Sequence, residues 1–117
     1  MTYEEIIKEL NSYKNLKDNW DGYGGIKPKD DIIETARNFI EILKNNNIGC
    51  PKIMVSGTGE IGIFWSSSTA YIEIDFDIKD KFTYFYNGNE LFGEDDLKVE
   101  RFLESKVYRK LKKEIYD

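Results

Sequence analysis

Histidine is absent from this 117-residue sequence, and cysteine occurs once. The first absence removes the commonest general base and the commonest metal ligand from any candidate site. The single cysteine, Cys50, excludes a disulfide within the chain. No apolar run approaches the roughly 18 residues of a membrane span, and the N-terminus lacks the pattern of a signal peptide. We therefore expect a cytoplasmic protein that is not an enzyme and that needs neither a metal nor a cofactor.

Charged residues, by contrast, make up 33% of the chain, and 22 acidic residues outnumber 17 basic ones. Residues 58–96 contain nine acidic and two basic side chains, whereas residues 97–117 contain four acidic and seven basic ones. An acidic middle disfavours nucleic acid, whose phosphates must be neutralised by Lys and Arg. The basic cluster near the C-terminus could attract an anion, although the solvated face of a helix explains it more simply. Its members are Lys106, Arg109, Lys110, Lys112 and Lys113.

Hydrophobic periodicity predicts the fold. Apolar residues recur at helical spacing in residues 2–13 and again from an N-cap at Asp30 or Asp31 to about residue 45. From residue 52 the period changes to two, and four β-rich segments (53–55, 61–65, 70–76 and 82–86) predict an antiparallel meander. Residues 95–116 return to helical spacing. This order predicts a single α+β domain over residues 1–117, with three helices packed on one face of a four-stranded sheet.

Two glycine-rich segments invite a ligand interpretation. Gly57, Gly59 and Gly62 match the dinucleotide fingerprint, but a strand pattern follows them where that site requires a helix, so a hairpin is the better prediction. Residues 19–24 have some spacing in common with a calcium loop, yet Tyr23 stands where an oxygen ligand is needed. We expect instead a structural loop in which Trp20 and Tyr23 anchor in the core and Asp21 accepts hydrogen bonds from loop amides. Its residues are Trp20, Asp21, Gly22, Tyr23 and Gly24.

The sequence of the same loop resembles a motif found in other proteins. Residues 16–24 (LKDNWDGYG), followed by Pro28 and a helix containing Ala36 and Phe39, resemble a motif of small, uncharacterised bacterial and phage proteins. Those proteins pair a W-D-G-x-G loop and a helix with a short β-meander. The resemblance covers about residues 10–76 and implies an origin and a fold, but no activity and no catalytic residue.

The segment 70–76 is the most informative for function. If Ile72, Ile74 and Phe76 face the helices, the alternate side chains form an acidic row on the opposite face, together with two phenylalanines from the neighbouring strands. A row along one flat strand offers no facing wall for glycoside hydrolysis. An aromatic and acidic surface suits a protein partner that presents Lys and Arg, although an ordinary solvated sheet face would look the same. The candidate partner-binding residues are Phe64, Tyr71, Glu73, Asp75, Asp77 and Phe85.

These observations predict a small protein-binding module that neutralises or regulates a larger protein with a basic surface. An antitoxin, an immunity protein and a phage-encoded inhibitor of host defence all fit this description. The alternative is a nucleic-acid-associated adaptor that uses the basic C-terminal helix. The exposed aromatic residues would also allow a homodimer. We expect no contact with a membrane.

Overall fold

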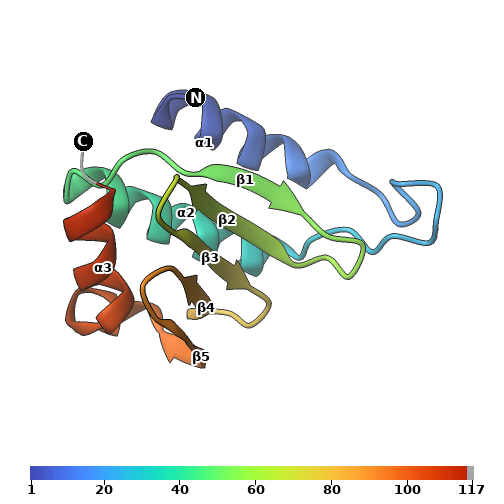
Figure 1. Ribbon diagram of the computed structural model, residues 1–117. Helices are drawn as coiled ribbons and strands as arrows, with labels where there is room; N and C mark the ends of the chain where they lie inside the picture. The colour runs from blue at the N-terminus through green and yellow to red at the C-terminus, as the bar shows by residue number, and fades with distance from the viewer. Residues whose placement is uncertain (116–117) are drawn as a thin grey trace.

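One antiparallel sheet of five strands and its covering helices form an α+β fold in the computed structural model, which describes residues 1–115 (Figure 1). The strands follow each other as neighbours in the order β1-β2-β3-β4-β5. No helix within this part of the chain is both long and apolar enough to cross a bilayer. In chain order, with η for 3-10 helices, the elements are α1 (Tyr3–Ser12), η1 (Tyr13–Asn15), α2 (Asp30–Asn45), β1 (Lys52–Val55), β2 (Ile61–Ser66), β3 (Tyr71–Phe76), β4 (Lys81–Asn87), β5 (Leu91–Lys98), η2 (Val99–Glu104) and α3 (Lys106–Glu114).

Helix α1 begins where the sequence predicts. The Thr2 hydroxyl accepts a hydrogen bond from the Glu5 amide, and the Glu5 carboxylate accepts one from the Thr2 amide, which completes the capping box. Ile6 and Leu10 are fully buried. The last turn tightens into η1, so the α-helix ends one residue before the predicted boundary.

Helix α2 lies along the sheet and supplies much of the core (Figure 1). The prediction of Asp30 or Asp31 as its N-cap is wrong: Lys29 occupies that position, and its carbonyl accepts from the amides of Ile32 and Ile33. The two aspartates occupy the first turn instead, where their charge favours the positive end of the helix dipole. At the centre of the core, the Phe39 ring lies 4.4–5.2 Å from the rings of Phe76, Phe82 and Phe102.

The β1–β2 connection is the hairpin that the glycines predict. The Ser56 amide donates to the Glu60 carbonyl, and the Gly59 amide donates back to the Ser56 carbonyl. Gly59 has a φ of +83°, a conformation that a side chain would strain. No helix follows the glycines, so the dipole that a dinucleotide site needs is not present there.

The sheet has a fifth strand that the sequence analysis did not predict. Residues 91–98 pair with β4, whereas residues 95–98 were expected to begin the C-terminal helix. The reason is a bulge: Tyr84 pairs with Glu94 and Phe82 pairs with Leu97, so β5 carries one extra residue there. The bulge places Phe92 and Leu97, five residues apart, on the core side, and this odd spacing hides the period of two.

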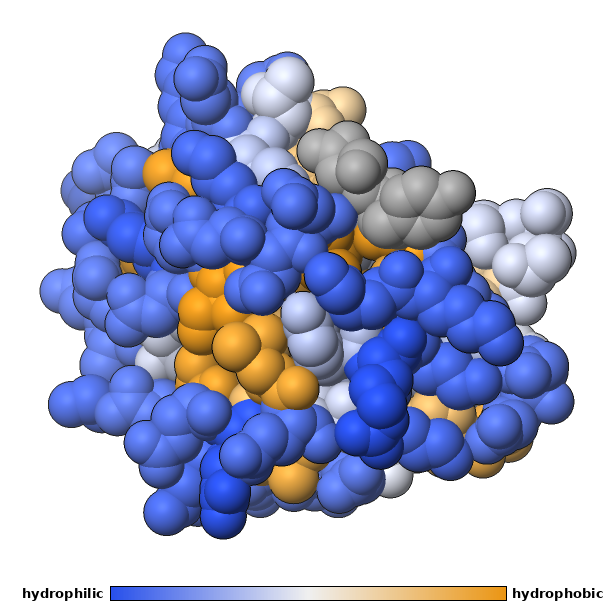
Figure 2. All heavy atoms as spheres, turned by 90° about the vertical axis from the view of Figure 1, so that its left-hand side faces the viewer, coloured by the Kyte–Doolittle hydropathy of each residue, from blue (hydrophilic) through white to orange (hydrophobic). Residues whose placement is uncertain are grey.

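The C-terminal helix is also shorter than predicted. Residues 99–104 form η2, and the Ser105 hydroxyl then accepts from the Tyr108 amide to cap α3. Of the apolar residues that suggested a helix over residues 95–116, Phe102, Val107 and Leu111 are buried, but Leu103 is 49% exposed. Figure 2, which views the molecule from the α3 side, shows an apolar patch surrounded by hydrophilic surface. The last residue of the predicted segment, residue 116, lies outside the described residues.

Candidate protein-interaction face

The sheet has one face on the helices and one face without a covering helix in the described chain (Figure 1). Across this second face, Phe64, Glu73 and Phe85 are direct neighbours on β2, β3 and β4, and Gly62, Asp75 and Thr83 form the next row. Tyr71 lies beside Phe64, with ring centroids 6.1 Å apart. We call the surface formed by Phe64, Tyr71, Glu73, Asp75 and Phe85 the open face. The alternation of β3 predicts this grouping.

The aromatic side chains of the open face are only partly shielded from solvent. Phe85 is 42% exposed, and Phe64 and Tyr71 are half-buried. Glu73 lies between Phe64 and Phe85 in the strand register, so an acidic residue separates two phenylalanines. This mixture of apolar area and charge is typical of surfaces that bind another protein.

The carboxylates of the open face are crowded. The Tyr71 hydroxyl donates to the Glu73 carboxylate, and burial together with this hydrogen bond raises the pKa of Tyr71 to about 12. Burial is also the main cause that raises the pKa of Asp75 to about 8. A hydrogen bond with Glu73 and repulsion from Glu73, Glu60 and Asp77 add to the shift. Asp75 therefore holds its proton at neutral pH.

A small hollow opens where β2 has a glycine. It measures about 180 Å³, and a Cβ atom placed on Gly62 would lie 2.7 Å from the Asp75 carboxylate and 2.8 Å from the Met54 methyl group. Burial and the charges of Asp77 and Glu73 raise the pKa of Glu60, which also lines this hollow. Among residues 1–115, no group of three or more His, Cys, Asp or Glu side chains is arranged to hold a metal ion. The residues around the hollow are Met54, Ser56, Glu60, Gly62, Glu73 and Asp75.

Asp77 does not belong to the strand itself. Strand β3 ends at Phe76, and Asp77 lies exposed one residue beyond it, near Glu60 and the β1–β2 turn. Its charge still raises the pKa values of Asp75 and Glu60. Asp77 therefore adds to the negative potential of the open face, although it is not one of the paired strand residues that form this face.

Sequence reasoning missed Met54, Glu60 and Gly62 as neighbours of the acidic residues. A signal was present, because a five-residue connection between 55 and 61 fixes the register that brings Gly62 opposite Met54. The register of the next hairpin then brings Asp75 beside Gly62.

The glycine-rich loop differs from its prediction in both aromatic residues, because neither Trp20 nor Tyr23 anchors in the core. Tyr23 is 93% exposed, and Trp20 is half-buried and donates from Nε1 to the Ile26 carbonyl of the same loop at 3.0 Å. Asp21 behaves as predicted: its Oδ1 accepts from the amides of Tyr23 and Gly25 at 2.9 and 2.8 Å. These two hydrogen bonds lower the pKa of Asp21. Gly22 and Gly24 turn the chain with φ values of +78° and +80°.

The basic side chains of α3 are largely engaged within the molecule. Glu90 lies 3.0 Å from Lys106 and 3.7 Å from Lys110, and these cations lower the pKa of Glu90. The same two amino groups lie over the rings of Phe92 and Tyr86, at 3.9 and 5.0 Å from the centroids. Two further members of the cluster donate to backbone carbonyls: Arg109 to Glu104 and Lys112 to Asn46. These contacts leave less of the cluster's charge for an external phosphate.

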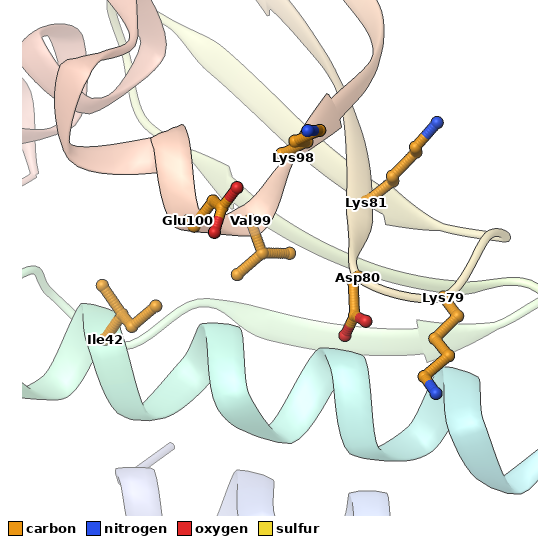
Figure 3. A pocket seen from close by; sticks show the side chains of 7 residues that line it. All are labelled: Ile42, Lys79, Asp80, Lys81, Lys98, Val99 and Glu100. Atoms are coloured by element: carbon orange, nitrogen blue, oxygen red, sulfur yellow. The ribbon is translucent and has the colours of Figure 1, made fainter.

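A groove of about 520 Å³ lies between α2, the β3–β4 turn and the start of η2 (Figure 3). Ile42 and Val99 face each other across it, while Lys81 points away from α2. The remaining lining residues, Lys79, Asp80, Lys98 and Glu100, carry charges of both signs. This lining defines no single ligand chemistry.

Comparison of the chain with known proteins identified no similar protein. No family model matches the chain, and neither a curated protein nor a solved structure is similar enough to count as a match.

Proposed function

We propose that this protein is a binding module that neutralises or regulates a larger protein, and that its open face docks on a basic surface of that partner. The observation that carries the proposal is a cluster of acidic side chains beside the Gly62 hollow that has no cation paired with it. Three carboxyl groups, those of Glu60, Glu73 and Asp75, crowd around it. Within residues 1–115 no Lys or Arg nitrogen lies within 4 Å of any of them.

A basic side chain of a partner fits this hollow both electrostatically and in shape. Its cation would offset the negative charges of Glu73, Glu60 and Asp77, which add to burial in raising the pKa of Asp75, and would thereby favour the ionised form of Asp75. The Met54 side chain offers an apolar wall for the aliphatic part of Lys or Arg. Phe64 and Phe85 add contact area on either side of Glu73, and their rings also attract cations.

The partner class follows from this chemistry. Proteins that bind nucleic acid present Lys and Arg for phosphates, and an acidic face can occupy the same residues. An antitoxin, an immunity protein or a phage-encoded inhibitor of host defence would act by such occlusion.

The test is a charge reversal on the open face. Tagged wild-type protein and the triple variant Glu73→Lys, Asp75→Lys, Asp77→Lys are used to capture a partner from lysate of the native host. A matched control carries Glu4→Lys, Glu41→Lys and Glu100→Lys, which replace the same number of acidic residues at exposed positions outside the open face. We expect one stoichiometric partner that the control retains and the open-face variant loses, with a dissociation constant raised at least about 100-fold for the purified pair. Equal capture by both variants would refute the assignment of the face.

A further inference from the structure

The side chains on the uncovered side of the sheet are sorted along the strands, with large apolar groups at one end and acidic groups at the other. Leu91 pairs with Asn87, two residues beyond Phe85, so Leu91 lies on the same side of the sheet as the open face. We call the surface of four large side chains at this end the apolar end. Its residues are Phe64, Tyr71, Phe85 and Leu91.

The apolar end leaves hydrophobic surface in contact with solvent. Leu91 is 70% exposed, and Phe85 is 42% exposed. The residue that pairs with Phe85 on β5 is Gly93, which has no side chain to cover the ring. A Cβ atom on Gly93 would lie 2.6 Å from the Tyr84 carbonyl oxygen, so this backbone geometry excludes a covering side chain.

At the other end of the same face the charge is negative. We call Glu60, Asp75 and Asp77 the acidic end, and the negative charge of Asp77 acts on both of the others. Lys81 and Lys98 pair with each other near this end. Among residues 1–115, no carboxylate lies within 4 Å of either amino group, so these lysines do not pair with the acidic end.

The strands beneath this face offer a partner no backbone groups to pair with. Strands β2, β3 and β4 each have a neighbouring strand on both sides, so their amide and carbonyl groups are directed at those neighbours. A partner segment that lies on this face must satisfy its own backbone groups, as an α-helix does. The other face of the same sheet already packs against a helix, α2 (Figure 1).

The two ends are separated by the length of a short helix. Tyr71 begins β3, and Asp77 lies one residue beyond its end, so the two are about 20 Å apart along the strand at about 3.3 Å per residue. About 13 helical residues cover the same distance at about 1.5 Å per residue. A helix of about four turns along β3 therefore reaches both ends.

We propose that the open face binds an amphipathic helix of the partner that lies along β3, with its apolar residues on the apolar end and its Lys or Arg residues over the acidic end. This inference rests on the proposed function and adds the element that docks and its orientation. Charge complementarity selects the orientation. Lys52 pairs with Phe64 and is exposed at the margin of the apolar end, so the reverse orientation would bring the partner's cations beside a lysine.

The test uses a library of displayed three-helix domains in which the outer positions of one four-turn helix are randomised. Purified wild-type protein selects binders from it. We expect selected helices to carry apolar residues in one half and Lys or Arg in the other. Phe85→Ser should weaken their binding at least about tenfold, whereas Leu103→Ser, at a similarly exposed position outside the open face, should have no effect. Leu91→Ser, at a more exposed position, gives the same test if Phe85→Ser does not fold.

Double-mutant cycles then measure the orientation. Replacing the basic residues of a selected helix with Gln should weaken binding to wild type by more than it weakens binding to Asp77→Asn. Replacing its apolar residues with Ala should likewise weaken binding to wild type by more than it weakens binding to Phe85→Ser. Coupling in the opposite pairs would show that the orientation is wrong.

The remaining outcomes separate this inference from the proposed function. The helix is refuted if no helix is enriched, if Phe85→Ser and Leu91→Ser both leave binding unchanged, or if the face instead pairs two copies of this chain in a dimer that Phe85→Ser dissociates. A native partner that the open-face charge reversal loses, but that Phe85→Ser and Leu91→Ser retain, also refutes the helix and leaves the proposed function standing. Helices bound in the expected orientation, with no native partner captured, support the helix and contradict the proposed function.

Discussion

At the scale of single residues, Asp75 makes the fold sensitive to pH. The unfolded chain ionises this carboxyl near pH 4, whereas the folded chain keeps the proton to about pH 8 because of burial and the charges of Glu73, Glu60 and Asp77. Between these values the unfolded state binds fewer protons, so the contribution of Asp75 to stability falls as pH rises.

Asp75→Asn should remove this dependence, since asparagine resembles the protonated acid. We expect the variant to gain about 1–2 kcal/mol relative to wild type between pH 5 and pH 8.5, less than the full pKa shift implies because the carboxyl is half exposed. Urea denaturation at the two pH values measures the difference. Parallel losses of stability in both proteins would contradict the shifted pKa.

Gly62 is the second residue with a defined expectation. A methyl group there collides with the Asp75 carboxylate and the end of Met54, so Gly62→Ala should destabilise the fold by about 1–2 kcal/mol and fill the acidic hollow. Gly57→Ala is the matched control, because its Cβ would lie an ordinary 3.5 Å from Asp21. Chemical denaturation of the two variants tests this, and equal stability would show that the hollow tolerates a side chain.

At the scale of elements, the cap between η2 and α3 carries a clear expectation. The Ser105 hydroxyl accepts from the Tyr108 amide and donates to the Phe102 carbonyl, so it joins the two helices. Ser105→Ala should cost about 1 kcal/mol of unfolding free energy. Ser68→Ala, in an exposed turn, should change little. A cap variant as stable as wild type would mean that packing of Val107 and Leu111 alone fixes α3.

The elements also show where prediction from sequence succeeds. Helix α2 and strands β2 to β4 have regular periods, and the acidic and aromatic residues of the open face follow from the alternation of β3. Strand β5 could not be found in this way, because its bulge breaks the period. The Gly62 hollow depends on strand register, and the exposure of Tyr23 depends on hydrogen bonds between loop residues, neither of which periodicity describes.

At the scale of the whole molecule, acidic and basic residues lie in different segments of the chain, but folding brings some of them together as ion pairs. The basic C-terminal segment folds back so that Lys106 and Lys110 meet Glu90. We therefore expect no shift of a short duplex DNA or a single-stranded RNA with micromolar protein, even at low salt, where phosphate contacts are strongest. A gel-shift titration tests this. A shift that Lys112→Gln and Lys113→Gln abolish would instead favour the adaptor function.

The two edges of the sheet have a consequence for the protein at high concentration. Strand β1 has only four residues and packs beside α1, while β5 combines a bulge, a φ of +55° at Asp96 and three consecutive acidic residues. Neither edge offers a long, flat row of backbone groups on which another strand could align. The short β1 edge and the bulged, acidic β5 edge therefore disfavour lateral growth of the sheet into a fibril, although aromatic side chains of the open face stay exposed.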